Sequence, residues 1–183
     1  MSVGVDLYGG IALFRSSVRR PILGHHSGSL GGPMRILTVP ACLVLMAAPL
    51  HSQATPSARH WGLAPAVFPP GARMAVVSGD PGKAGPFTVE LAFPAGYKIP
   101  PHFHPTTETV TVKKGTLLVG MGDTFDASKT KPMQAGDSGS IPANAHHFAA
   151  AKGATFITVS AMGPFAMTYV HPADHPQKPA AKP

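Results

Sequence analysis

Two histidines and a glutamate between residues 102 and 108 have the spacing of a metal site. His102 and His104 are separated by one residue in a stretch with a β-type pattern. Side chains two apart in a strand point to the same face, so both imidazoles can reach one ion. Glu108 shares the parity of this pair and begins a strand pattern that continues through Val110 and Val112. A carboxylate in such an apolar interior needs a partner or a cation, and a metal ion would supply one.

Imidazole nitrogens and a carboxylate oxygen, without sulfur, make a donor set that suits a divalent transition metal. Zn, Cu, Fe, Mn and Ni are the candidates, because Ca and Mg prefer oxygen ligands. Open coordination positions around a redox-active ion would favour an enzyme, whereas a closed tetrahedral zinc site would favour a binding or structural role. The one cysteine, Cys42, lies in a segment that we expect to be removed. Thiolate ligands and disulfides are therefore excluded from the mature chain.

Residues 60–171 have the pattern of an all-β domain. From Phe87 to Phe93, apolar and mostly polar residues alternate, which is typical of a half-buried strand. Turn signals such as Gly136-Asp137 separate the strand candidates, and no capped amphipathic helix interrupts them. Many short strands at this spacing predict a sandwich or a barrel. The further candidates are Met74–Val77, Thr116–Met121, Ser138–Ile141, Thr155–Ser160 and Phe165–Val170.

The first 54 residues divide into two segments. A charged start at Met34 precedes an apolar run of about 15 residues, and Ser52 and Ala54 then supply the small residues of a cleavage site. This order predicts a cleavable secretory signal over 34–54. The apolar run is shorter than the roughly 20 residues that a spanning helix needs. We expect 1–33 to be a disordered upstream extension, and the mature protein to be periplasmic or secreted without a stable membrane span.

Charge and composition exclude other function classes. The formal net charge is +7, but the basic residues beyond the expected signal are scattered, so we expect no nucleic-acid surface. Arg59 and Arg73 are the only arginines after that signal, which disfavours substrates that need an arginine fork, such as dicarboxylates and phosphates. A small, rather apolar ligand or substrate is favoured instead. The end of the chain, 172–183, is rich in Pro, Ala and Lys and predicts a disordered tail.

The candidate ligands lie in a motif that resembles the first motif of the cupin superfamily. Gly96, five residues, His102-x-His104, three residues, Glu108, six residues and Gly115 match that motif at every defining position. The resemblance implies a small jelly-roll (cupin) β-barrel, with the metal inside one end.

A second stretch resembles the second cupin motif, with two departures. It begins at Gly136, and Asn144 stands where the family usually has glycine. Asparagine tolerates left-handed backbone better than most residues. Ala151 stands where the family has its final asparagine. The resemblance implies that His147 is the third histidine ligand, although its neighbour His146 competes for that role.

Two functions remain open. The resemblance implies an exported single-domain cupin with a site of three histidines and one glutamate. One interpretation is a metal-dependent oxidoreductase, dioxygenase-like, that acts on a small apolar molecule. The alternative is a non-catalytic metal- or ligand-binding or sensing cupin with zinc, since 93–105 and 120–123 also look like the zinc-binding cupin domain of certain anti-sigma factors. Cupins often pair through edge strands, so the resemblance implies a homodimer as well.

The residues that we expect to line a pocket near the metal are Tyr97, His146, Met121 and Tyr169.

Overall fold

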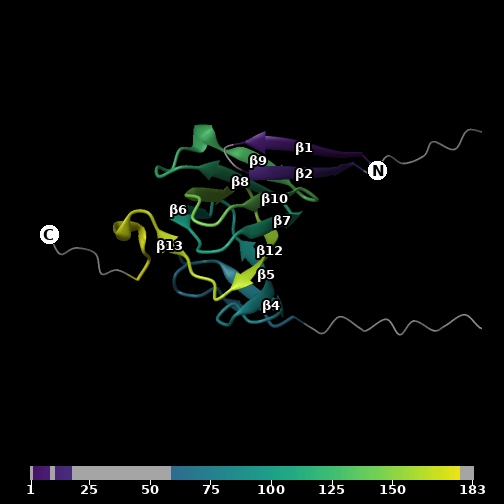
Figure 1. The fold of residues 1–183 in the computed structure, drawn as a ribbon. Helices are drawn as coiled ribbons and strands as arrows, with labels where there is room; N and C mark the ends of the chain where they lie inside the picture. Colours follow the sequence, from purple (N-terminus) through teal and green to yellow (C-terminus); the bar gives the residue numbers. More distant parts are fainter. Residues whose placement is uncertain (1, 9–10, 18–58, 178–183) are drawn as a thin grey trace, which may run out of the picture. The chain divides into compact units, whose positions relative to one another are not determined.

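The computed structural model describes residues 2–8, 11–17 and 59–177 (Figure 1). Its strands form two antiparallel sheets, which we call sheet A and sheet B. The strands of sheet A are β1 (Ser2–Tyr8), β2 (Ile11–Ser17), β3 (Gly62–Leu63), β4 (Arg73–Ser78), β5 (Gly85–Phe93), β7 (Glu108–Lys114), β10 (Ser138–Ile141) and β12 (Thr155–Gly163). The strands of sheet B are β6 (Lys98–Phe103), β8 (Thr116–Met121), β9 (Lys131–Gln134), β11 (His147–Ala151) and β13 (Thr168–Tyr169).

The strand order differs from the chain order in both sheets. Sheet A has the order β1-β2-β10-β7-β12-β5-β4-β3, and sheet B the order β13-β6-β11-β8-β9. Among the described strands, no member of sheet A pairs with a member of sheet B. The all-β jelly-roll prediction is therefore confirmed as two antiparallel sheets, but not as a closed barrel.

The inner faces of the two sheets share one apolar core. In β5, Val89 and Leu91 are buried in this core, as the alternation of the strand predicts. In sheet B, Leu117 and Val119 of β8 belong to the same core. The core thus lies between the sheets, and the site residues described below lie at one end of this space.

The strand pairing brings residues that are distant in sequence to the same place. His147 in β11 is the register partner of His102 in β6. Glu108 begins β7 in the other sheet, where it pairs with Ile141 and Ala161. Sheet B therefore supplies histidines and sheet A supplies the carboxylate, so the site depends on both sheets.

The two ends of the chain differ from the sequence expectation. Within 1–33 the structure has the antiparallel strands β1 and β2, and β2 pairs with β10. Val3, Val5 and Leu7 alternate in sequence with other residues, which is the period of a strand. The abundance of Gly and Ser in 1–33 had favoured disorder instead. The expected signal over 34–54 lies outside the described residues.

The remaining described elements are the 3-10 turns η1 (Ala127–Lys129) and η2 (Pro172–Asp174). The second turn lies at the start of 172–183, where the sequence predicted a disordered tail.

The described helices are short 3-10 turns. None of them, within the part of the chain that the structure describes, is long and apolar enough to cross a bilayer.

Strands β8 and β11 approach each other closely at Gly120. Its register partner Phe148 is 0% exposed, and a Cβ at Gly120 would overlap the Phe148 ring. We expect Gly120→Ala to lower the free energy of unfolding by about 1–3 kcal/mol, because the core cannot accept the extra methyl group. Urea denaturation measures this change. Gly153→Ala is the control, since a Cβ there meets no atom within 4 Å, and equal stabilities of the two variants would contradict the packing argument.

Candidate metal centre

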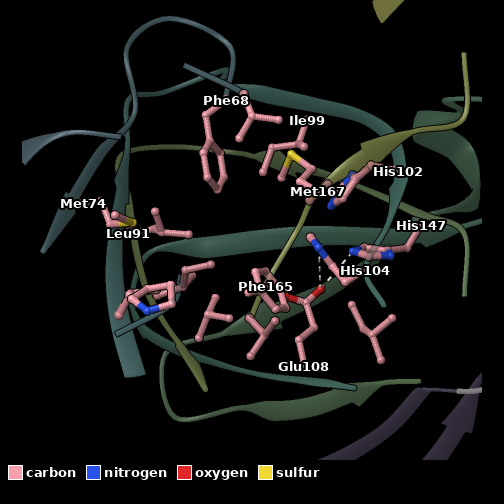
Figure 2. A pocket seen from close by; sticks show the side chains of 18 of the residues that line it. Phe68, Met74, Leu91, Ile99, His102, His104, Glu108, His147, Phe165 and Met167 are labelled. Atoms are coloured by element: carbon pink, nitrogen blue, oxygen red, sulfur yellow. Dashed lines mark ion pairs between the residues drawn. The ribbon is translucent and has the colours of Figure 1, made fainter. Parts of the chain in front are cut away.

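Three buried histidines meet at one end of the space between the sheets (Figure 2). His102 lies in β6, His147 lies opposite it in β11, and His104 directly follows β6. Their side chains offer ligand atoms that all lie within 4.8 Å of one another, and each residue is at most 4% exposed. Such a cluster of imidazoles is compatible with the binding of one transition-metal ion.

Each of the three imidazoles is held by a hydrogen bond to the main chain. A carbonyl oxygen can only accept, so the Nδ1 atom of each ring must carry the proton. In the neutral ring, Nε2 then keeps its lone pair. Bonds of this kind fix the tautomer and the orientation of metal-binding histidines. The Nδ1–H groups donate from His102 to Pro100 (2.8 Å), from His104 to Ala166 (2.7 Å) and from His147 to Ala145 (2.9 Å).

Glu108 faces the free nitrogens of this cluster. Its Oε1 atom lies 2.9 Å from Nε2 of His147 and 3.5 Å from Nε2 of His104. Both nitrogens bear lone pairs in the neutral rings, so either extra protons or a cation must lie between them and the carboxylate. Two atoms that are each about 2.1 Å from one ion lie about 3.0 Å apart at a right angle and about 3.4 Å apart at the tetrahedral angle. The separations of 2.9 and 3.5 Å are therefore compatible with a cation between Glu108 and these two nitrogens.

Burial and mutual contact shift the pKa values of the residues at the site. Burial lowers the pKa of His102 well below 6.5, and the nearby His147 and His104 lower it further. Burial also lowers the pKa of His104, although the charge of Glu108 opposes this shift. For Glu108, burial raises the pKa, but the hydrogen bond with His147 and the charges of the two histidines outweigh it and bring the pKa below 4.5. Neutral imidazoles and an ionised carboxylate are the metal-binding forms of these groups.

The turn before β11 decides which of two adjacent histidines enters the cluster. Asn144 has a φ of 60°, so it adopts the left-handed backbone that the family's glycine would supply. Its N–H donates to the carbonyl of His104 at 2.8 Å. Beyond this turn His147 is buried in the cluster. His146 instead has Nδ1 2.6 Å from Oδ1 of Asp123, and its side chain is 38% exposed.

A cavity of about 180 Å³ extends from the cluster into the space between the sheets. Apart from the three histidines and Glu108, every side chain that lines it is apolar. Figure 2 shows Met74 and Leu91 at the end of the cavity away from the imidazoles. An engineered apolar cavity of about 150 Å³ is known to bind benzene, so this cavity has room for a small organic molecule.

Sequence reasoning missed several residues that line the cavity. Phe165 and Met167 come from the loop between β12 and β13, and the Phe165 ring stacks on His104 with centroids 4.3 Å apart. Phe68 comes from the segment before β4. The sequence pattern predicted a strand over Phe165–Val170, whereas the structure has a loop before β13 (Thr168–Tyr169). No sequence pattern connected either segment to the histidines.

The residues expected to line a pocket do not line this cavity. Two of them are buried tyrosines that hold one of its walls. The Tyr97 hydroxyl donates to the carbonyl of Pro69 at 2.6 Å, and that of Tyr169 donates to the carbonyl of Val67 at 2.7 Å. Burial raises the pKa of both phenols, that of Tyr169 to about 12. These neutral donors therefore fix the segment 65–69, which contributes Pro65, Val67 and Phe68 to the cavity lining.

The other two expected residues lie elsewhere. The side chain of His146 is outside the cluster, as described above. Met121 is the register partner of His147 on β8 and packs, half-buried, against the core.

The bond from Tyr97 to the 65–69 segment gives a prediction. We expect Tyr97→Phe to lower the free energy of unfolding by about 1–3 kcal/mol, because the Pro69 carbonyl loses its buried donor. The amide of Phe68, which donates to the carbonyl of Pro65, should exchange with solvent faster. Urea denaturation and amide hydrogen exchange measure the two effects. Unchanged exchange at Phe68 would show that Tyr97 does not hold this segment.

The shifted pKa values also predict a pH dependence for the metal-free protein. Because His102 and His104 have pKa values below 6.5 in the folded state, the unfolded chain takes up protons first as pH falls through 6.5. The free energy of unfolding should therefore decrease below pH 6.5. Glu108 should add a further decrease below pH 4.5, since its folded-state pKa is also lowered.

Urea denaturation with a chelator, at several pH values between 7.5 and 5.5, measures the effect. His102→Gln is the matched variant, because it removes one of the two titrating imidazoles and should show a smaller decrease. A wild-type protein that becomes more stable on acidification over this range would contradict the prediction.

Comparisons with known proteins identify the family. A family model described as a cupin domain matches residues 89–160. The chain is similar to the structure of a proposed acetylacetone dioxygenase from Methylibium petroleiphilum, with 26% identity over 67% of this chain and 81% of that chain, and a TM-score of 0.51. It shares its fold with the polyketide cyclase RemF from Streptomyces resistomycificus, with 16% identity over 68% of this chain and 88% of that chain, and a TM-score of 0.56.

An RmlC-like cupin from Shewanella frigidimarina is also similar, with 20% identity over 50% of this chain and 76% of that chain, and a TM-score of 0.43. No curated protein matches the sequence. The family-model match spans both motifs and contains all three clustered histidines. Residues 89–160 therefore form a domain of the cupin superfamily.

Proposed function

We propose that this protein is an exported cupin that binds one divalent transition-metal ion and acts as a dioxygenase-like oxidoreductase on a small apolar molecule. His102, His104, His147 and Glu108 would hold the ion. One observation carries the proposal: three imidazoles with main-chain-bonded Nδ1 atoms and one carboxylate converge at the end of an otherwise apolar cavity.

The residues of the chain have separate tasks in this proposal. A redox-active ion, when bound, supplies a site for dioxygen and polarises an oxygen atom of the substrate. The apolar walls exclude water and hold the body of the substrate beside the ion. Among the side chains that line the cavity, Glu108 is the only carboxylate, so any proton accepted by a carboxylate during the reaction would go to this residue.

A relative with a proposed activity supports this function. The structure from Methylibium petroleiphilum described above is named for an acetylacetone dioxygenase, and its 26% identity extends over 67% of the present chain. A small uncharged diketone is the kind of molecule that an apolar cavity with an ion at one end would accept.

A non-catalytic zinc-binding cupin is the second candidate. The donor atoms of three histidines and one glutamate would complete a tetrahedral shell around zinc and leave no position for a substrate. The 3.5 Å between Oε1 of Glu108 and Nε2 of His104 is close to the tetrahedral separation given above. Zn, Cu, Fe, Mn and Ni thus all remain candidates for the ion.

Export is proposed from the sequence. The predicted signal over 34–54 would deliver the protein to the periplasm or the medium, with processing after Ala54. Mass spectrometry of the protein from a cell fraction would show the start of the mature chain. A cytoplasmic protein that retains this segment would contradict export.

We expect metal-stripped protein to regain thermal stability on addition of its native metal, because binding to the folded state adds to stability by mass action. His102→Gln and Glu108→Gln should each weaken metal binding by more than about 100-fold, beyond the effect of partners that only orient a ligand. His146→Gln is the matched control, because this exposed neighbour lies outside the cluster. Calorimetry measures metal binding, and unchanged binding in His102→Gln would contradict the site.

Oxygen uptake then separates the two candidate functions. Protein loaded with Fe, Mn, Ni or Cu should consume dioxygen in the presence of acetylacetone, whereas protein loaded with zinc should not. Zinc binding without oxygen uptake by any of the redox-active forms would favour the non-catalytic alternative.

A further inference from the structure

We infer that the molecule bound in this cavity carries its polar oxygen atoms at one end and an uncharged body at the other. Molecules of the same size with a charge on the body would be excluded. The inference rests on the proposed function, because it takes the metal ion as the partner of the polar end.

The polarity of the cavity is divided between its two ends. Its polar side chains are the three clustered histidines and Glu108, which contacts His104 and His147. Beyond them the lining consists of aliphatic, aromatic, methionine and proline side chains. Figure 2 shows the labelled apolar residues Phe68, Met74 and Leu91 away from the imidazoles. A ligand that fills the cavity must therefore place its body among groups that offer no side-chain hydrogen bond.

No cation lies in the lining to pair with an anionic body. None of the lining residues is a lysine or an arginine. Within 59–177, the Arg59 guanidinium lies 2.7 Å from a carboxylate oxygen of Glu90, and Arg73 donates to the carbonyl of Trp61 at 3.0 Å. A charge buried without a partner is strongly unfavourable. A carboxylate or phosphate on the body of a ligand would therefore oppose binding.

A charge at the metal end has a different effect. With neutral imidazoles, a divalent ion and the Glu108 carboxylate leave a net positive charge at this end. An oxygen donor that ionises on the ion is compensated there, because opposite charges attract strongly in a medium of low dielectric constant. The cavity thus discriminates by the position of a charge on the ligand and not by total charge alone.

Two catechols of matched shape test this distinction. Both 4-acetylcatechol and 3,4-dihydroxybenzoate offer the same pair of donor oxygens, and they differ on the body in a methyl group against a carboxylate oxygen. We expect protein loaded with Co²⁺ to bind 4-acetylcatechol at least about 100-fold more tightly, because the carboxylate is buried without a partner. Anaerobic titration followed by the visible spectrum of cobalt measures both affinities without any turnover.

A positive charge added at the apolar end should reduce the preference. Met74 lines the cavity and is partly exposed, so a lysine can be accommodated there. Met74→Lys should reduce the preference for 4-acetylcatechol by at least about tenfold, because the ammonium group pairs with the carboxylate. Met74→Leu is the control, and it should keep the wild-type preference.

The outcomes separate the inference from the proposed function. Protein that fails to bind Co²⁺ at this site would overturn the proposed metal centre and this inference with it. Protein that binds Co²⁺ and then binds both catechols equally, or neither, would overturn the inference alone. A preference that Met74→Lys and Met74→Leu change to the same extent would also overturn it.

Discussion

Four groups with unshared electron pairs converge in an apolar interior, and the surrounding structure depends on how their mutual repulsion is relieved. Without a cation, the Glu108 carboxylate and the Nε2 atoms of the histidines can remain close only if protons lie between them. Burial makes those protons costly, since it lowers the pKa of His102 and His104. A bound cation would relieve this repulsion without protons, with His102 and His104 neutral, the form that their burial favours.

The fold holds these groups together by dividing them between two sheets. Register pairing of β6 with β11 brings His102 and His147 into contact range, and β7 presents Glu108 from the opposite sheet. The loop that carries Ala166 then supplies the acceptor for His104. Because these elements are far apart in sequence, the site forms only when both sheets have assembled.

Local periodicity allowed the first part of the site to be predicted from the sequence. His102, His104 and Glu108 share one strand parity, and the structure buries all three at one place. His147 required the resemblance to a known motif, because the residues around it show no strand alternation that would separate it from His146. The places of Tyr97 and Phe165 could not be predicted, since each depends on a contact with a segment that is distant in sequence. Strands β1 and β2 were not predicted, because Gly and Ser are abundant in this segment and its alternation of apolar residues is short.

The imidazoles are oriented by main-chain carbonyl groups, so the orientation of the rings and the shape of the cavity depend on different parts of the chain. A side-chain substitution at Pro100, Ala145 or Ala166 leaves the accepting oxygen in the chain. The walls of the cavity, in contrast, are built from side chains such as Phe68 and Met74. Sequence changes can therefore alter the shape of the ligand-binding space while the orientation of the metal-binding rings is retained, so that new ligand preferences can evolve around an unchanged centre.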